Sequence, residues 1–189
     1  MMNRGEFTPS LKQRIKTVLV PDYTMMWLSA MRHASFYKTR GGGYKLLYIK
    51  WIRKFRRLSL KLGFSIETDV FGYGLVVPHY GTIVVGGTNR VANYAVLHSS
   101  SCIADRSSTI GNGLYLSAGA IISSHVELGD NITVGANCTV NKSFFQNNVL
   151  LVGSPADVKK VSEAWYIRDG EHFQKRVQEV EKLRKQLGL

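Results

Sequence analysis

Histidine is the side chain in this sequence best suited to acid–base chemistry, because its ordinary pKa of about 6.5 lies close to neutrality. A neutral imidazole can accept the proton of a hydroxyl group that acts as a nucleophile. The chain has five histidines, which are His33, His79, His98, His125 and His172. The three central ones are separated by 19 and 27 residues. Metal-binding histidines usually include two that are close together in the sequence, so we expect no metal site.

The segment that must position these histidines repeats every six residues. Apolar residues recur in one frame at Ile110, Leu116, Ile122, Leu128, Val134 and Val140. Glycine follows three of them, at Gly111, Gly129 and Gly135. The same spacing recurs upstream at Val91, Leu97 and Ile103, and again at Val70 and Val76. A helix has a period of 3.6 and a strand a period of 2, so a period of six indicates a repeating unit of a parallel β-helix.

Two further features belong to this repeat. Residues 105–109 interrupt it, because Ile103 and Ile110 are seven residues apart. Cys138 occupies a small, inward position and is predicted to be a buried free thiol. With Cys102 as the other cysteine, no disulfide framework is expected.

The beginning of the chain has no apolar signal-peptide core and no apolar run is long enough to cross a bilayer, so we expect a cytoplasmic protein.

Helices are predicted before the repeat. Residues 8–39 favour two helices separated at Pro21, with Asp22 or Thr24 able to cap the second. The glycines at 41–43 predict a break, and residues 44–62 predict a third helix that ends at Gly63. Its apolar face comprises Tyr48, Trp51, Ile52, Phe55, Leu58 and Leu62. This face either packs on the β-helix or, with the surrounding lysines and arginines, lies on an anionic membrane.

The positive charge is concentrated in this first part of the chain. The net charge is +12, and residues 1–62 carry 14 basic side chains against Glu6 and Asp22. A basic segment beside a neutral one is typical of proteins that bind a membrane surface or a polyanion.

After the repeat, residues 159–187 are predicted to be helical. The apolar series Phe173, Val177, Val180, Leu183 and Leu187 favours either pairing with a neighbouring chain or docking on the coils.

With the six-residue repeat, the segment VVPHYGTIVVGG at 76–87 and VGSPADV at 152–158, the chain resembles the hexapeptide-repeat acyltransferases. It is most similar to serine acetyltransferases and to relatives that acetylate surface polysaccharides. The resemblance covers residues 64–160. It implies a left-handed β-helix, acetyl-CoA as the acetyl donor, and a homotrimer with active sites between neighbouring β-helices.

The resemblance also implies roles for particular residues. His79 matches the catalytic histidine, which would remove the proton of the acceptor hydroxyl as it attacks the thioester. Asp105 and Arg106 match an acceptor-binding loop. The acetyl-CoA groove would be formed by Ala118, Ala136, Asn141, Lys142, Ser154, Pro155 and Ala156, with Lys159 or Lys160 near the 3′-phosphate.

Three positions depart from the serine acetyltransferase pattern. The aspartate that orients the catalytic histidine is replaced by Phe64, so Glu67 or Asp69 would have to substitute, and we select Glu67. The acidic residue before the catalytic histidine is Pro78, and the histidine of the acceptor-binding loop is Ser107. These changes argue against free serine as the acceptor, and they leave the donor site unaffected.

The sequence therefore predicts a mainly β protein, a left-handed parallel β-helix with a helical N-terminal segment and a C-terminal helix. The expected divisions are residues 1–63, 64–158 and 159–189. The predicted function is acetyl transfer from acetyl-CoA to a hydroxyl of a sugar or surface-polysaccharide precursor. The alternatives are a serine O-acetyltransferase and a non-catalytic trimeric scaffold that binds membrane or polyanion. Residues 44–62 are the candidate contact with the inner membrane face, and no nucleic acid is expected as a partner.

Overall fold

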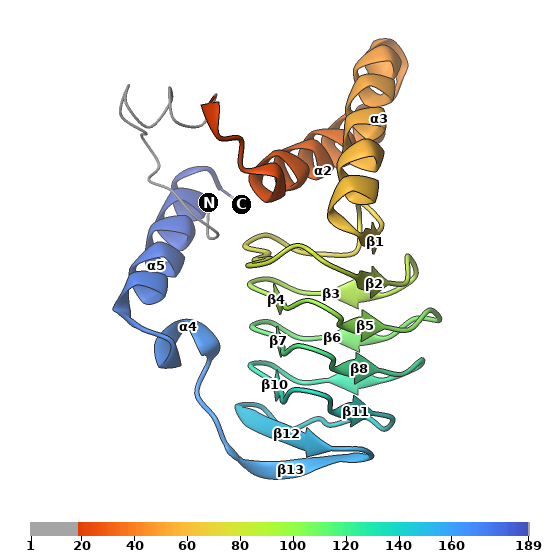
Figure 1. Ribbon diagram of the computed structural model, residues 1–189. Helices are drawn as coiled ribbons and strands as arrows, with labels where there is room; N and C mark the ends of the chain where they lie inside the picture. The colour runs from red at the N-terminus through yellow and green to blue at the C-terminus, as the bar shows by residue number, and fades with distance from the viewer. Residues whose placement is uncertain (1–18, 189) are drawn as a thin grey trace.

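The computed structural model describes residues 19–188 and contains a stack of short parallel strands with helices at one end and along one side (Figure 1). The first predicted helix, within residues 8–20, lies almost entirely outside the described residues. None of the described helices is long and apolar enough to span a bilayer. The helices are α2 (Tyr23–Arg40), the 3-10 turn η1 (Gly42–Tyr44), α3 (Lys45–Leu62), α4 (Trp165–Arg168) and α5 (Glu171–Gln186).

The strands form three sheets that follow one another around each coil. Sheet A has the order β1-β2-β5-β8-β11, sheet B the order β3-β6-β9, and sheet C the order β13-β12-β10-β7-β4. Neighbouring strands pair in parallel except for β12 and β13, which form an antiparallel hairpin. The strands are β1 (Phe64–Ile66), β2 (Ile83–Val85), β3 (Arg90–Val91), β4 (Val96–Leu97), β5 (Cys102–Ile103), β6 (Thr109–Ile110), β7 (Tyr115–Leu116), β8 (Ile121–Ile122), β9 (Glu127–Leu128), β10 (Thr133–Val134), β11 (Thr139–Val140), β12 (Val149–Gly153) and β13 (Ala156–Val161).

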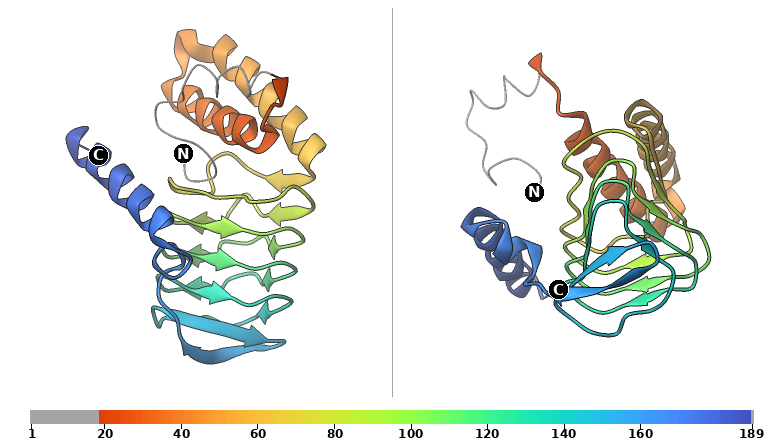
Figure 2. Two further views of the ribbon diagram at one scale, coloured as in Figure 1. Left: turned by 60° about the vertical axis from the view of Figure 1, so that its left-hand side comes forward. Right: turned by 60° about the horizontal axis from the view of Figure 1, so that its bottom comes forward.

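The six-residue repeat supplies the interior of this parallel β-helix, so the predicted fold class is confirmed. All six apolar residues from Ile110 to Val140 are buried, and each closes a strand that pairs with the coil above or below. Burial of these aliphatic side chains provides the main driving force for the stack. Cys138 is buried and free, as predicted. With the lower end of the stack turned toward the viewer, the coils have a roughly triangular outline with α5 beside one face (Figure 2, right).

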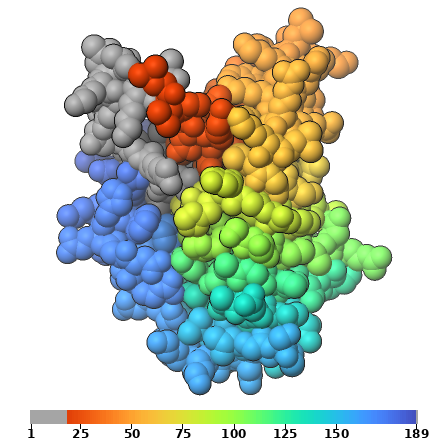
Figure 3. Space-filling view, viewed as in Figure 1, coloured from red at the N-terminus to blue at the C-terminus, as the bar shows by residue number. Residues whose placement is uncertain are grey.

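Helices α2 and α3 form a hairpin that covers the first coil. Asp22 caps α2 by accepting a hydrogen bond from the Met25 amide, and Gly63 ends α3 in a left-handed conformation. Trp27 of α2 stacks on Phe55 of α3 with ring centroids 5.5 Å apart. The predicted apolar face of the third helix thus packs mainly on α2, with Leu62 reaching the first coil. The N-terminal part of α3 projects beyond the coils (Figure 3).

The C-terminal segment differs from the predicted helix over 159–187. Residues up to Val161 form β13, because their backbone pairs with β12 and completes the edge of sheet C. Helix α5 begins at Glu171 and lies along the outer face of sheet C (Figure 1). Phe173, Val177 and Val180 pack there beside Trp165. Docking on the coils therefore holds for the first three residues of the apolar series, whereas Leu183 and Leu187 are exposed.

Candidate active site

The corner between sheets C and A carries His79 and a column of small residues below it. Val76 bridges Val96, which pairs with Tyr115, and Tyr115 in turn pairs with Thr133. Three residues beyond the paired position, the lower coils therefore place Ser99, Ala118 and Ala136 one above another. Backbone hydrogen bonds from Gly119 to Ser99 and from Asn137 to Ala118 confirm this stacking.

The first of these corners is longer than the others, and His79 lies in the extra length. Eight residue steps separate Val76 from Val84, compared with six from Val96 to Cys102 at the level below. A Cβ built on Gly81 would be 3.3 Å from Cβ of Ser99, so Gly81 occupies the place above Ser99 in the column. His79 and Tyr80 form the bulge that precedes Gly81, and both are exposed. The column is thus Gly81, Ser99, Ala118 and Ala136, with an exposed imidazole at its head.

A second imidazole lies beside the first. The ring centroids of His79 and His98 are 6.1 Å apart, and His98 Nε2 is 2.8 Å from the Tyr115 hydroxyl oxygen. Burial, and secondarily the charge of His79, hold the pKa of His98 below its usual value, with Asp169 opposing. Burial raises the pKa of Tyr115, with a smaller contribution from Asp169 and an opposing one from Arg168. At neutral pH both partners of this hydrogen bond are therefore uncharged.

The far side of Tyr115 is held by the C-terminal segment. The Arg168 guanidinium lies over the Tyr115 ring at 4.9 Å from its centroid. The same guanidinium donates a hydrogen bond to Thr133 Oγ1 at 2.9 Å and pairs with Asp169. Arg168 and Tyr115 are more than fifty residues apart in the sequence, so no local pattern predicts the contact. The contact of His98 with this corner could be detected from its register. His98 follows a strand of sheet C and lies one coil below Pro78, the residue next to His79.

The predicted acceptor-binding residues lie at another corner. Asp105 and Arg106 follow β5 and form part of the corner between sheets A and B. Thr88 anchors this loop, because its hydroxyl donates to Asp105 and accepts hydrogen bonds from the amides of Arg106 and Ser107. Within one chain the fold does not bring this loop and His79 to the same corner.

The predicted orienting carboxylate, Glu67, also follows a strand of sheet A. A Cβ on Gly87 would meet its side chain at 3.0 Å. Its neighbour Asp69 accepts hydrogen bonds from Ser35 and Lys38 of α2, and that contact raises the pKa of Lys38, with a smaller contribution from Glu67. No carboxylate of residues 19–188 hydrogen-bonds to His79, so the role of Glu67 stays a prediction.

The other predicted donor-site residues surround the lower end of the coils. Asn141 and Lys142 follow β11, and Lys142 is 3.9 Å from Asp157. Pro155 lies in the turn of the β12–β13 hairpin, next to the end of the small-residue column. Lys159 and Lys160 are exposed on β13. Lys160 also lines a surface hollow together with Arg168, Ser162 and Glu163.

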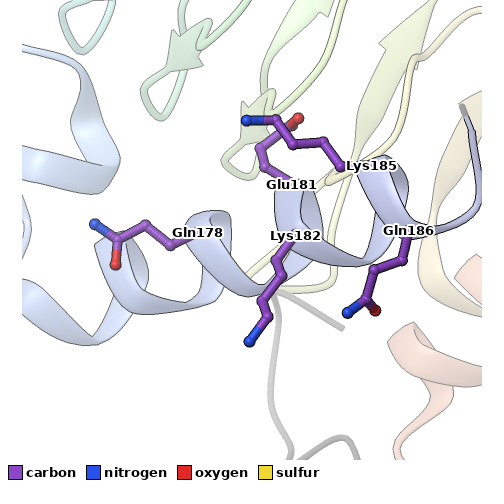
Figure 4. Close-up of a pocket in the computed structure, with 5 residues that line it drawn as sticks. All are labelled: Gln178, Glu181, Lys182, Lys185 and Gln186. Atoms are coloured by element: carbon purple, nitrogen blue, oxygen red, sulfur yellow. The ribbon is translucent and has the colours of Figure 1, made fainter.

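The remaining histidines lie elsewhere. His33 stacks on Trp51 at 4.1 Å between α2 and α3, His125 is exposed at the corner between sheets A and B, and His172 is exposed at the start of α5. Among residues 19–188, no three His, Cys, Asp or Glu side chains are grouped closely enough to hold a metal ion. Another hollow is lined, among residues 19–188, by Gln178, Glu181, Lys182, Lys185 and Gln186 of α5, whose side chains project in different directions (Figure 4). None of these described lining residues belongs to the His79 corner.

Solved structures with the same fold include several serine acetyltransferases. One described as a serine acetyltransferase in complex with CoA has 22% identity and a TM-score of 0.61, covering 76% of this chain and 60% of its own. The Neisseria gonorrhoeae serine acetyltransferase has 24% identity and a TM-score of 0.60, covering 83% of this chain and 62% of its own. A hexapeptide-repeat serine O-acetyltransferase from Brucella melitensis has 22% identity and a TM-score of 0.64, covering 83% and 65%.

These matches establish the fold and no more, because identity is low and this chain spans less than two thirds of the length of each of these proteins. No family model matches the sequence. No curated protein matches it either.

Proposed function

We propose that the chain is an acetyl-CoA-dependent O-acetyltransferase that acts on a hydroxyl of a sugar or surface-polysaccharide precursor. One observation carries the proposal: an exposed imidazole stands at the head of a column of small residues, Gly81, Ser99, Ala118 and Ala136. Pantetheine is a slim amide chain, and small side chains with accessible backbone groups suit it. A solved protein of the same fold is described as a complex with CoA, which supports this choice of donor.

In the proposed reaction His79 acts as the general base. It accepts the proton of the acceptor hydroxyl while the hydroxyl oxygen attacks the thioester carbonyl carbon, forming a tetrahedral intermediate. The carbon–sulfur bond then breaks, and the CoA sulfur takes the proton from the imidazolium. The products are the acetyl ester and free CoA. The exposure of His79 leaves its ring accessible to an incoming hydroxyl.

Assembly is part of the proposal. Asp105 and Arg106 lie at the A–B corner, whereas His79 lies at the C–A corner, so one chain alone does not present both groups to one acceptor. In a closed ring of three β-helices, the A–B corner of one copy can meet the C–A corner of the next. Each acceptor site would then contain His79 of one copy and Arg106 of another.

The main alternative is serine O-acetylation, which the names of the solved neighbours favour. Pro78 and Ser107 favour a saccharide, because the side chains expected to bind serine are missing at both positions. A panel containing L-serine and the methyl glycosides of glucose, galactose and mannose, with acetyl-CoA and a thiol-reactive dye, separates the two. Thiol release with a glycoside and none with serine supports the proposal, and the reverse result supports the alternative.

A non-catalytic scaffold is a further alternative of another class, and the same assay addresses it. Such a protein would release no CoA with any acceptor and would not bind acetyl-CoA in calorimetry.

We also propose that α3 brings the protein to an anionic membrane surface. Its basic side chains are mostly exposed, and the apolar Leu46, Leu47 and Ile49 of its projecting end are exposed as well. The apolar face that the sequence predicts for membrane contact packs on α2 instead. In the proposal, these three exposed residues contact the membrane in its place. Such a combination of cations and exposed aliphatic side chains is typical of helices that bind a membrane interface.

A further inference from the structure

We infer that His98, held by Tyr115, donates a hydrogen bond to an oxygen of the acceptor that neighbours the reacting hydroxyl. The acceptor is therefore polyhydroxylated, with a second oxygen beside the acetylated position. This inference rests on the proposed function, because it assigns a specificity-determining residue to the same site.

The first step is the position of His98. It stands at the C–A corner one residue before Ser99, on the side of sheet C, while the small-residue column continues downward from Ser99. The ring centroids of His98 and His79 are 6.1 Å apart. Two imidazoles at this separation can each contact one of two adjacent oxygens on the same molecule. His79 faces the reacting oxygen, and His98 faces its neighbour.

The second step is the direction of the hydrogen bond between His98 and Tyr115. Both groups are uncharged at neutral pH, for the reasons given above. The phenol hydrogen has no other acceptor among residues 19–188. Donation from the Tyr115 hydroxyl to Nε2 satisfies both partners, and it fixes the remaining proton of the imidazole on Nδ1. Nδ1–H has no partner within the described chain, so it is available to a ligand oxygen.

The third step is the rigidity of this arrangement. Tyr115 lies on β7 and is covered by the Arg168 guanidinium, which is itself tied to Thr133. Because Tyr115 is fixed in this way, its hydroxyl also fixes the orientation of the His98 ring. A ring with a fixed orientation is suited to binding a ligand of one particular geometry. A carboxylate could not replace His98 in this role, because it would accept a hydrogen bond where the site needs a donor.

The first test requires no acceptor. Nitrogen-15 NMR of the histidine rings in the full chain at pH 7 should show His98 as the neutral Nδ1–H tautomer. In Tyr115→Phe the two tautomers should both be populated. An Nε2–H tautomer in the parent protein would overturn the inference, and so would a charged ring.

The second test compares acceptors and variants. The probes are the methyl glycosides of glucose, galactose and mannose, and the monodeoxy analogues that lack a hydroxyl beside the acetylated position. His98→Ala should raise the acceptor KM about tenfold with kcat changed less than about threefold, since one neutral hydrogen bond is lost. With the deoxy analogue, parent and His98→Ala should have the same KM.

A conservative pair of variants separates this role from a structural one. The amide nitrogen of Asn lies near the position of imidazole Nδ1, and that of Gln near Nε2. His98→Asn should therefore recover most of the lost acceptor affinity, and His98→Gln should behave like His98→Ala. His172→Asn, on the exposed start of α5, is the matched control and should leave KM unchanged.

The outcomes distinguish this inference from the proposed function. Equal losses in His98→Asn and His98→Gln, or equal losses on the glycoside and its deoxy analogue, would overturn the inference while acetyl transfer stands. Turnover of L-serine without turnover of any glycoside would overturn both the inference and the saccharide acceptor of the proposed function. Absence of acetyl-CoA binding and of CoA release with every acceptor would remove the proposed function itself.

Discussion

At the scale of single residues, the candidate site contains two histidines in contrasting surroundings. His79 is exposed in the bulge of the first corner and makes no hydrogen bond within residues 19–188. His98 is partly buried and hydrogen-bonded to Tyr115. A group that must both accept and return a proton needs access to its substrate, whereas a group that only positions a ligand benefits from being fixed. The environment of His79 therefore suits a general base, and that of His98 suits a residue that positions the acceptor.

His79→Ala should fold normally and lose most acetyl transfer, because a general base contributes about 100- to 10,000-fold to the rate. The measurement is CoA release with the acceptor found in the panel, and circular dichroism checks the fold. His172→Ala serves as the control for removing an exposed histidine. Near-normal turnover in His79→Ala would exclude His79 as the base.

Ala136→Trp should weaken acetyl-CoA binding by more than about tenfold, because an indole would fill the column of small residues that we assign to pantetheine. Lys175→Trp, which places the same bulk on an exposed position of α5, should bind acetyl-CoA as the parent does. Titration calorimetry measures both. Unchanged affinity in a folded Ala136→Trp variant would show that the donor binds elsewhere.

At the scale of helices and strands, the regular parts of the chain were predictable and the contacts between distant segments were not. The six-residue frame predicts the interior residues of the coils, because equivalent positions of successive coils point into the same interior and require apolar side chains there. The helix signals at Asp22 and Gly63 likewise marked real ends. The placement of α5 on sheet C, and that of Arg168 over Tyr115, depends on a chain reversal after β13 that leaves no periodic signal.

The same limit applied to the candidate site. His79 was predicted from a motif, but the pairing of His98 with Tyr115 emerges only when successive coils are stacked. The sequence predicts a helix at residues 159–161, which is wrong. Their lysines and valine are compatible with a helix or with a strand, so residue type alone does not decide between them. The strand pairing with β12 decided the outcome.

Helix α3 should bind anionic vesicles through its exposed cations. Changing Arg53, Lys54, Arg56 and Arg57 to Gln removes four charges, each contributing about 1 kcal/mol near an anionic surface. Binding to phosphatidylglycerol vesicles should then fall by roughly 1,000-fold, and binding of the parent should weaken with salt. Co-sedimentation provides the measurement.

A control for this experiment replaces Lys175, Lys182 and Lys185 of α5 by Gln and should retain most of the vesicle binding. Acetyl transfer to a soluble acceptor should be unchanged in the α3 variant. A parent protein that ignores anionic vesicles at low salt would show that α3 serves only to cover the first coil.

Helix α5 is fastened to the coils by a carboxylate that should release it in acid. Glu181 accepts hydrogen bonds from the hydroxyls of Tyr94 and Tyr73 and pairs with Arg184. These contacts, with that of Tyr94 the largest, hold the pKa of Glu181 below its ordinary value. A lowered carboxyl pKa contributes stability above the unfolded value of about 4.3, and that stability is lost as the pH falls through the folded value.

Hydrogen-exchange protection of α5, corrected for intrinsic rates, should therefore decline below about pH 4.3 in the parent. In Glu181→Gln the protection should already be reduced at pH 6 and should change little over the acidic range. Equal protection of parent and variant at pH 6 would mean that the apolar contacts of Phe173, Val177 and Val180 suffice to hold the helix.

At the scale of the whole molecule, six of the predicted site residues divide between two corners of the β-helix. His79, Ala118 and Ala136 belong to the C–A corner, while Asp105, Arg106 and Asn141 belong to the A–B corner. A single chain presents these groups in different directions. In the proposed assembly, a site shared between copies of the chain would bring these groups together.

This arrangement predicts complementation between two inactive variants. His79→Ala and Arg106→Ala should each be inactive alone, whereas an equimolar mixture assembled together should recover about a quarter of the parent activity, since random mixing completes that share of intersubunit sites. CoA release by the mixed assembly is the measurement. A mixture as inactive as its components would place both residues in the site of one chain.

The hairpin of β12 and β13 also decides where the stack of coils stops. A parallel β-helix ends in an open row of backbone donors and acceptors, which is a template for another strand. Here β13 turns back antiparallel and becomes the outermost strand of sheet C, with Lys159 and Lys160 exposed on it. Charged side chains on an outermost strand repel the approach of a second such edge. Lys159 and Lys160, one of which we expect near the CoA 3′-phosphate, should therefore also disfavour the joining of β-helices end to end into filaments.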